Sequence, residues 1–433
     1  MQNQKKKGLV TVKKRILAII TTLSVITGTA AAAAYGVQRT IDVIGGVSVF
    51  MDGNELEMTD VNGNPVDAFV YDGTTYLPAR AISEANGNTI SWDGEEGRVD
   101  ITSSENTGEN PNAARLIDQD DRYFIFDLSD TVARTEVTYT NRYGIELAAD
   151  LYTSVDLDET QQYPAIVIGP PYGGVKEQGP GVYANQLAQR GFVVLAFDPS
   201  YNGESGGEPR HLSSPEIFSE DFSAGVDFLG SLDYVDREKI AALGICGSGG
   251  FAISAAAMDT RIKAVVTSAM YDISAMGNSL EGDERTEWID GFSQQRWADF
   301  EDGAPAYQRT YPLDAPLDEL PDNLTGTDIE WWTFYGMERG WHPNSGGSFT
   351  NTSMLPFSNY PLLSHIDDIS PHPIMFITGD IAHSRSMSEE FYEMAAEPKE
   401  LVVVPGAMHI DLYDKVDLIP FDEIEAFLNE AFN

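Results

Sequence analysis

Hydrophobic and polar positions follow a regular alternation along residues 131–433. Short apolar runs such as Val193–Phe197 alternate with longer segments of helical periodicity. A continuous apolar run is typical of a strand that is buried on both faces of a sheet. The predicted strands are Thr135–Tyr139, Ile145–Tyr152, Ala165–Ile168, Phe192–Phe197, Lys239–Ile245, Ala264–Ala269, Ile374–Thr378 and Leu401–Val404. The predicted helices are Val182–Arg190, Phe218–Leu232, Gly249–Met258 and Asp422–Ala431. This order predicts an α/β fold with a mostly parallel, doubly wound sheet.

One stretch, residues 273–370, interrupts this alternation. It carries five of the six tryptophans, namely Trp288, Trp297, Trp331, Trp332 and Trp341. Because the stretch lies between two predicted sheet strands, we expect a helical cap insertion over the strand ends. The alternative is a small helical subdomain that packs its own core, and a cap that lines a pocket would satisfy both interpretations.

The chain before residue 131 has a different pattern. Residues 38–103 contain short β-rich stretches, such as Ala68–Tyr71 and Arg98–Thr102, separated by turn dipeptides, with one short helix predicted at 78–85. The segments Tyr71–Ala81 and Ile90–Asp93 resemble the copper amine oxidase N-terminal-like (stalk) domain. That block contains no His and no Cys, so we expect no copper in it. The resemblance implies spacing or attachment, with a cell wall as the candidate partner, and residues 104–130 are expected to be a linker and lead-in.

Residues 1–34 have the composition of a secretory signal. Six basic residues, Lys5, Lys6, Lys7, Lys13, Lys14 and Arg15, precede the apolar run Ile16–Ile26, and small residues follow. We therefore expect a secreted or cell-surface protein, with an uncleaved N-terminal anchor as the alternative. The formal net charge is −41, and without the leader it is 21 − 68 = −47. Such a charge repels phosphate backbones and argues against a nucleic-acid partner.

The segment Gly244–Gly250, Gly-Ile-Cys-Gly-Ser-Gly-Gly, joins a predicted strand to a predicted helix. Such a sharp turn holds its apex residue in a strained conformation and needs small residues two positions before and after it. Cys246 at the apex is flanked by Gly244 and Ser248, whereas Ser248 at the apex is flanked by Cys246 and Gly250. We favour Cys246, the only cysteine of the chain, because a helix N-terminus stabilises a thiolate. The alternatives are Ser248 as the nucleophile and a buried, inert cysteine.

Several segments in the order of the chain resemble one branch of a known superfamily. They are Gly173–Gln178, Ala196–Arg210, Gly244–Gly250, Ala382–Ser384 and His409–Tyr413. Together they make residues 131–433 resemble the dienelactone-hydrolase-like branch of the α/β-hydrolases. The resemblance implies a Cys or Ser nucleophile, an acid and a His in that chain order, with Cys at the position of Cys246.

The base and the acid are predicted from their places after strands. His409 follows the last predicted strand and is the candidate base. Asp380, which follows the strand at 374–378, is the preferred orienting acid, although the usual acid position here is Ala382. Asp272 and Asp411 are the alternatives.

The remaining candidates concern the surroundings of the nucleophile. Backbone N–H groups of Gly247 and of either Tyr172 or Gly173 are expected to form an oxyanion hole, because the prolines of that loop cannot donate. His383 lies beside the acid loop and could contact substrate or order the loop. No histidine pair has metal-ligand spacing near a carboxylate cluster, so neither a metal nor an organic cofactor is expected.

The sequence thus predicts an exported hydrolase that cleaves a carboxylic ester, thioester or lactone of a small molecule through an acyl-enzyme. A peptidase or acyltransferase on the same elbow is one alternative. A catalytically silent cell-surface binding protein is the other, since a fold alone does not determine a function.

Overall fold

The computed structural model describes residues 123–433 continuously, together with strands and a few single positions between Ile44 and Leu116. The chain divides into two compact units, Met1–Ala113 and Ala114–Asn433. The predicted leader, residues 1–34, lies outside the described residues, as does most of the helix predicted at 78–85. In the part of the chain that is described, no helix combines the length and the apolarity that crossing a bilayer requires.

The N-terminal unit is built of short antiparallel strands. One sheet has the order β1-β4-β5, and two separate pairs are β2-β3 and β6-β7. Their bounds are β1 Ile44–Val47, β2 Phe50–Met51, β3 Asn54–Glu55, β4 Ala68–Tyr71, β5 Thr74–Tyr76, β6 Asn88–Asp93 and β7 Arg98–Ser103. The residues Asp72 and Gly73 separate β4 from β5 in the sequence, and these two strands pair antiparallel.

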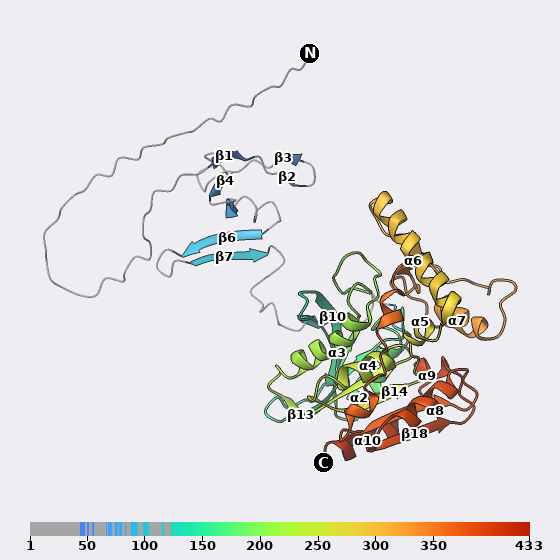
Figure 1. Ribbon diagram of the computed structural model, residues 1–433. Coiled ribbons are helices and arrows are strands. Elements are labelled where there is room, and N and C mark those ends of the chain that lie inside the picture. The colour runs from blue at the N-terminus through green and yellow to red at the C-terminus, as the bar shows by residue number, and fades with distance from the viewer. Residues whose placement is uncertain are drawn as a thin grey trace, which may run out of the picture. The chain divides into compact units, whose positions relative to one another are not determined.

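The C-terminal unit is organised around a nine-stranded sheet with the order β18-β17-β14-β13-β11-β12-β10-β9-β8 (Figure 1). The strands are β8 Arg115–Leu116, β9 Val132–Thr140, β10 Glu146–Ser154, β11 Tyr163–Gly169, β12 Val193–Phe197, β13 Val235–Ile245, β14 Ile262–Ser268, β17 Ile374–Gly379 and β18 Lys399–Val404. The six strands β18, β17, β14, β13, β11 and β12 pair in parallel with their neighbours. Strands β10, β9 and β8 continue the sheet as an antiparallel edge. The predicted α/β fold and its opening hairpin are confirmed.

Both faces of this sheet are covered by helices, as the continuous apolar strands predict. Ile166 and Ile168 of β11 belong to the core on one face, with α2 (Gly179–Ala188) and α10 (Phe421–Ala431). Ala165 and Val167 belong to the core on the other face, with three further helices. Those helices are α3 Pro215–Leu229, α4 Ser248–Ala256 and α8 Arg385–Met394. Successive side chains of one strand therefore point alternately into the two hydrophobic cores.

The segment between β14 and β17 contains the predicted cap. Its elements are α5 Ala275–Asn278, α6 Gly282–Asp302, β15 Tyr307–Gln308, α7 Thr327–Tyr335, β16 Phe349–Thr350, η1 Pro356–Asn359 and η2 Ile366–Ile369. Helix α6 has no buried residue and projects from the body of the unit (Figure 1). Helix α7 instead buries Phe334 and Tyr335. A short helix, α9 (Asp411–Asp414), follows β18.

A buried cluster of charges holds the loop after β11 to the loop after β12. The ammonium of Lys176 contacts the carboxylates of Glu177, Asp198 (3.5 Å) and Glu204 (2.7 Å), and its backbone N–H donates to Asp198 at 2.8 Å. Burial opposes the charge of Lys176, but the carboxylates of Asp198 and Glu177 raise its pKa above the usual value. The loop that begins at Gly169 is therefore anchored at its far end by a cation in the interior.

Replacing this buried cation should destabilise the protein far more than replacing a surface one. Lys176→Met leaves buried carboxylates without their partner and should lower the free energy of unfolding by about 3–5 kcal/mol. Arg142→Met, which removes an exposed arginine 2.7 Å from Glu220, should cost at most about 1 kcal/mol. Urea unfolding of the full chain, followed by tryptophan fluorescence, measures both. Equal losses in the two variants would contradict an anchoring role for Lys176.

Candidate active site

Cys246 occupies the apex of a sharp strand-to-helix turn between β13 and α4. Its φ is +53°, in the left-handed region that a side chain with a Cβ rarely adopts. A Cβ on Gly244 would collide with the carbonyl of Ser248, so only glycine allows the turn to close. Ser248 is the first residue of α4, and its hydroxyl donates to the carbonyl of Pro170. The structure thus places Cys246, and not Ser248, at the apex.

The sulfur of Cys246 lies where the two predicted donors converge. The backbone N–H groups of Gly247 and Tyr172 and the hydroxyl of Tyr413 lie near it and act to lower its pKa. Burial nevertheless raises the pKa of the Cys246 thiol, because it outweighs the effect of these donors. The expectation that the helix N-terminus favours a thiolate is therefore corrected: the buried site favours the neutral thiol, and a base has to remove its proton.

His409 is fully buried and follows β18, as predicted. Burial, together with the neighbouring His383, lowers its pKa well below the usual value, so the imidazole is neutral at neutral pH. Its Nδ1 is 2.6 Å from the hydroxyl of Ser384, and its Nε2 is 2.9 Å from the hydroxyl of Tyr413. A neutral imidazole with one free lone pair is suited to accept a proton.

The carboxylates predicted as the orienting acid lie elsewhere. Asp380 is exposed, and its Oδ1 accepts the N–H of Gly406 at 2.6 Å. Asp272 accepts the N–H and hydroxyl of Ser274, and Asp411 pairs with Lys415 at 2.8 Å. The expected contact of Asp380 with His409 is therefore corrected, since Nδ1 of His409 is bonded to Ser384. The hydroxyl comes from the start of α8 and occupies the place expected for a carboxylate.

A carboxylate does approach the histidines, and it comes from the cap. Glu330 on α7 is buried; its Oε1 accepts the N–H of Ile410 at 2.6 Å and its Oε2 lies 3.3 Å from Nδ1 of His383. The ring of His383 stacks on that of His409, with centroids 4.6 Å apart. His383 thus lies between the cap carboxylate and the base, while ordering of the acid loop and contact with substrate stay predictions for it.

A cavity of about 260 Å³ opens beside these groups. Its lining comes from the loop after β11 and from the cap: Tyr172, Gly173, Met276, Gln308, Thr310, Tyr311, Trp331, Tyr335, Gly347, Phe349, Thr350, Asn351, Ser353 and Met354. The ring of Trp331, which lines the cavity, lies 5.0 Å from the ring of His409, which does not line it. No Asp, Glu, Lys, Arg or His is among the lining residues. Of the five cap tryptophans only Trp331 takes part, and Trp297 on α6 is exposed.

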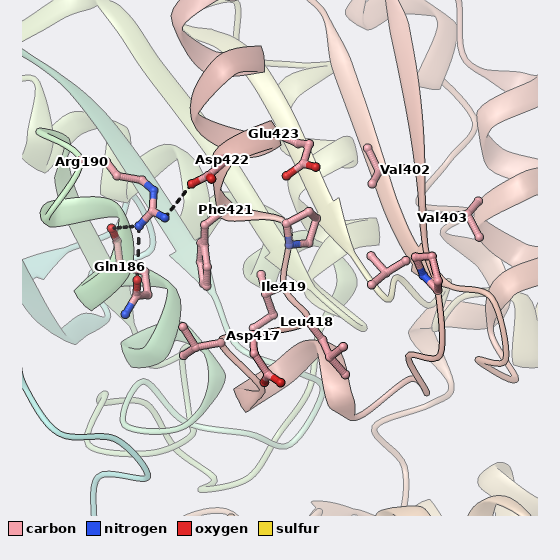
Figure 2. A pocket seen from close by; sticks show the side chains of 14 residues that line it. Gln186, Arg190, Val402, Val403, Asp417, Leu418, Ile419, Phe421, Asp422 and Glu423 are labelled. Carbon is pink, nitrogen blue, oxygen red and sulfur yellow. Dashed lines mark hydrogen bonds and ion pairs between the residues drawn. The ribbon is translucent and has the colours of Figure 1, made fainter.

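A larger cavity, of about 440 Å³, lies away from this chemistry. Figure 2 shows it between α2, β18 and the start of α10, with Arg190 paired to Asp422 at 2.9 Å and Val402 and Val403 on the opposite side. None of the residues of the candidate site lines it. Tyr172 lines the smaller cavity, which is therefore the one adjacent to the candidate site, although Cys246 and His409 do not line it.

Among the described residues, one group of side chains has the spacing of a metal site. Oxygens of Glu177, Asp198 and Glu204 lie within 4.8 Å of one another. The ammonium of Lys176 contacts all three carboxylates and offsets part of their negative charge. A lysine ammonium therefore occupies the position that a metal ion would take among these oxygens.

Three contributors to the site were not predicted. Tyr413 lies in α9, four residues after His409, which precedes that helix, and its hydroxyl meets Nε2 of His409. Ser384 lies in a recognised segment but was given no role, because a carboxylate was expected. Glu330 comes from the cap, and no pattern in the sequence places it near His409.

Both units match known families. Residues 50–110 match the copper amine oxidase N-terminal domain, which confirms the resemblance of the first unit. Residues 143–334 match the family described as X-Pro dipeptidyl-peptidase (S15 family). The α/β-hydrolase resemblance is confirmed by the fold, whereas the dienelactone-hydrolase branch stays a prediction.

Relatives of known sequence cover most of the C-terminal unit. The uncharacterized protein PA2218 of Pseudomonas aeruginosa is 49% identical over 337 residues, which is 76% of this chain and 88% of that protein. The uncharacterized protein YcjY of Escherichia coli is 37% identical over 290 residues, 65% of this chain and 92% of YcjY. The polyketide transferase grgF of Penicillium sp is 25% identical over 305 residues, 70% of this chain and 96% of grgF.

Solved structures agree with the fold. The crystal structure of PA2218 aligns with a TM-score of 0.68 at 49% identity, over 73% of this chain and 99% of that one. The crystal structure of the alpha/beta hydrolase GrgF from Penicillium aligns with a TM-score of 0.57 at 23% identity, over 69% of this chain and 99% of that one. At that identity the second match concerns the fold alone.

The contacts of His409 predict unequal effects at Ser384 and Asp380. Ser384→Ala removes the partner of Nδ1 and should slow alkylation of Cys246 by iodoacetamide about fivefold to tenfold, the worth of one hydrogen bond. Asp380→Asn should leave the rate within about twofold, because Asp380 is exposed and bonded to Gly406. Intact-mass spectrometry over time measures both rates. A large loss in Asp380→Asn with none in Ser384→Ala would restore Asp380 as the orienting acid.

Proposed function

Because this chain belongs to the family of α/β-hydrolase-fold proteins that includes PA2218 of Pseudomonas aeruginosa and YcjY of Escherichia coli, we propose that it hydrolyses a carboxylic ester, thioester or lactone through an acyl-enzyme on Cys246. The observation that carries the proposal is the position of the Cys246 sulfur, at a strained elbow and facing two backbone N–H groups. The finer, dienelactone-hydrolase-like assignment rests on the sequence segments alone.

The reaction begins with deprotonation of the Cys246 thiol, whose proton goes to His409. The thiolate attacks the substrate carbonyl, and the carbonyl oxygen takes the negative charge where the N–H groups of Gly247 and Tyr172 converge. Collapse of the tetrahedral adduct breaks the bond to the leaving group, which takes the proton from His409. Water, deprotonated by the same histidine, then releases the acid and regenerates the thiol.

The geometry also favours Tyr172 over Gly173 as the second donor. The N–H of Tyr172 points to the sulfur, whereas the carbonyl of Gly173 accepts the hydroxyl of Ser345 at 3.0 Å. The ring of Tyr172 stacks on Phe349 with centroids 4.2 Å apart, which holds the loop against the cap. Lys176, buried four residues further on, anchors the same loop from the other side.

Transfer of the acyl group to an acceptor other than water is the second candidate. It is favoured by the likeness to grgF, whose name is polyketide transferase. The same elbow and base serve both reactions, and the description of the matching S15 family names a peptidase, which also acts on an acyl group. A silent surface protein is the outcome that remains if no acyl substrate reacts.

Export and attachment are part of the proposal. The basic and apolar pattern of residues 1–34 supports secretion or retention at the cell surface. The N-terminal unit matches a module of its own, and we propose that it spaces or attaches the hydrolase, with a cell wall as the candidate partner.

Turnover of short-chain nitrophenyl esters tests the nucleophile. Cys246→Ala should lower kcat by about 10³-fold or more, because the attacking atom is lost. Ser248→Ala should retain kcat within about tenfold, since its hydroxyl only bonds the carbonyl of Pro170. His409→Ala should be as poor as Cys246→Ala, and the exposed His365→Ala is the matched control. Loss confined to Ser248→Ala would make the serine the nucleophile, and an inert wild type would favour transfer or a silent protein.

The uncharged lining of the 260 Å³ cavity predicts selectivity for neutral acyl groups. A substrate carboxylate there would be buried without a partner, in a chain of net charge −41. The mono-nitrophenyl ester of succinate should therefore show kcat/KM about 100-fold below that of its methyl ester, which has the same acyl chain without the charge. Steady-state kinetics on the two compounds measures the ratio. Equal values would place the acyl group outside this cavity.

A further inference from the structure

We infer that Tyr413 is a catalytic residue that carries the proton between Cys246 and His409. The inference rests on the proposed use of Cys246 as the nucleophile and goes beyond it by assigning the proton path. The hydroxyl of Tyr413 lies 2.9 Å from Nε2 of His409, and Tyr413 shares a buried core cluster with Cys246, whose thiol it neighbours on its other side. It therefore stands between the group that loses the proton and the group that receives it.

The surroundings keep Tyr413 in this position. Its side chain is fully buried, and the ring of Phe334 on α7 meets it edge-on, with centroids 5.4 Å apart. The carbonyl of the preceding residue, Leu412, accepts the hydroxyl of Tyr183 on α2 at 2.8 Å. A Cβ on Gly179 would come within 3.8 Å of the Cβ of Tyr413, so α2 also packs closely against it. Packing against α2 and α7 therefore fixes the position of the Tyr413 ring.

The tautomer of His409 follows from its two contacts. If Tyr413 donates its O–H to Nε2, then Nδ1 carries the ring hydrogen and donates it to the hydroxyl of Ser384 at 2.6 Å. Nε2 is then a free acceptor. Burial raises the pKa of Tyr413 well above its usual value, so the phenol is neutral at rest and able to donate.

The relay balances as two coupled transfers. The S–H bond of Cys246 breaks and its proton moves to the oxygen of Tyr413, while the O–H bond of Tyr413 breaks and its proton moves to Nε2. The electron pair of the S–H bond stays on sulfur as the thiolate, Tyr413 ends as a phenol again, and His409 becomes an imidazolium. The reverse path returns the proton to the leaving group, and no further reactant is consumed.

The single cysteine of this chain allows the relay to be tested without a substrate. Every mass increase with iodoacetamide reports the Cys246 thiolate alone. At pH 7.5, Tyr413→Phe should slow alkylation about 100-fold, as should His409→Ala, because each breaks the same path. The double variant should be no slower than either single one. Tyr152→Phe, which removes the hydroxyl of another fully buried tyrosine, should keep the wild-type rate.

Two results would overturn the relay. One is alkylation of Tyr413→Phe within threefold of wild type while His409→Ala is slow, which would mean that His409 acts directly. The other is a wild type that reacts no faster than His409→Ala. Circular dichroism and the urea midpoint establish that each variant is folded.

A measurement on the wild type keeps the inference falsifiable if Tyr413→Phe does not fold. In full-length protein with ¹⁵N-labelled histidine, the signals missing from His409→Ala identify His409. They should show hydrogen on Nδ1 and none on Nε2 at neutral pH, and the opposite tautomer would exclude donation from Tyr413. Failure of the proposed function has a different readout from failure of the relay. If ester turnover survives Cys246→Ala, Cys246 is not the nucleophile, whatever the alkylation rates show.

Discussion

The left-handed backbone at Cys246 is the constraint on which the candidate site depends. The sheet supplies it, because the N–H of Cys246 donates to the carbonyl of Ser268 at 2.9 Å and its carbonyl accepts from Gly249 and Tyr271. Gly244 lets α4 turn back over the strand without a collision. With the apex held this way, the sulfur neighbours Tyr172 of the loop after β11 and Tyr413 of α9. The backbone N–H donors, the base His409 and Tyr413 all lie on the side of the turn that the sulfur faces.

Local rules account for the parts of the molecule that the sequence predicts. Strand β12 is apolar throughout because both of its faces are buried, and the elbow needs glycine wherever a Cβ would strike backbone. His409 follows β18 because the carboxyl ends of parallel strands gather at one edge of the sheet. Each of these requirements acts within a few residues, so a pattern in the sequence reveals it. The copper amine oxidase-like unit was likewise predicted from local patterns, namely its short strands and the turn dipeptides between them.

The parts that escaped prediction depend on contacts across long separations. Asp380 follows the expected strand but bonds the N–H of Gly406, and a serine at the start of α8 meets His409 instead. Helix α8 itself was missed, because only Ser388 and Phe391 of its residues are buried and the remainder is polar. Glu330 reaches the histidines only because the cap folds over the strand ends. The tryptophan-rich segment predicted a cap or a subdomain with its own core, and no pattern in it indicated that α6 buries none of its residues.

The burial that keeps the Cys246 thiol protonated has a second consequence, for the lifetime of the protein. Oxidants attack the thiolate far faster than the thiol, and the first product, a sulfenic acid, leads on to forms that are not reversed. A thiolate formed only when a base takes its proton is exposed to this damage for a small part of each cycle. The lone cysteine has no second thiol in the chain with which to form a disulfide and so be rescued. The low reactivity of the resting sulfur thus protects it against oxidation between catalytic cycles.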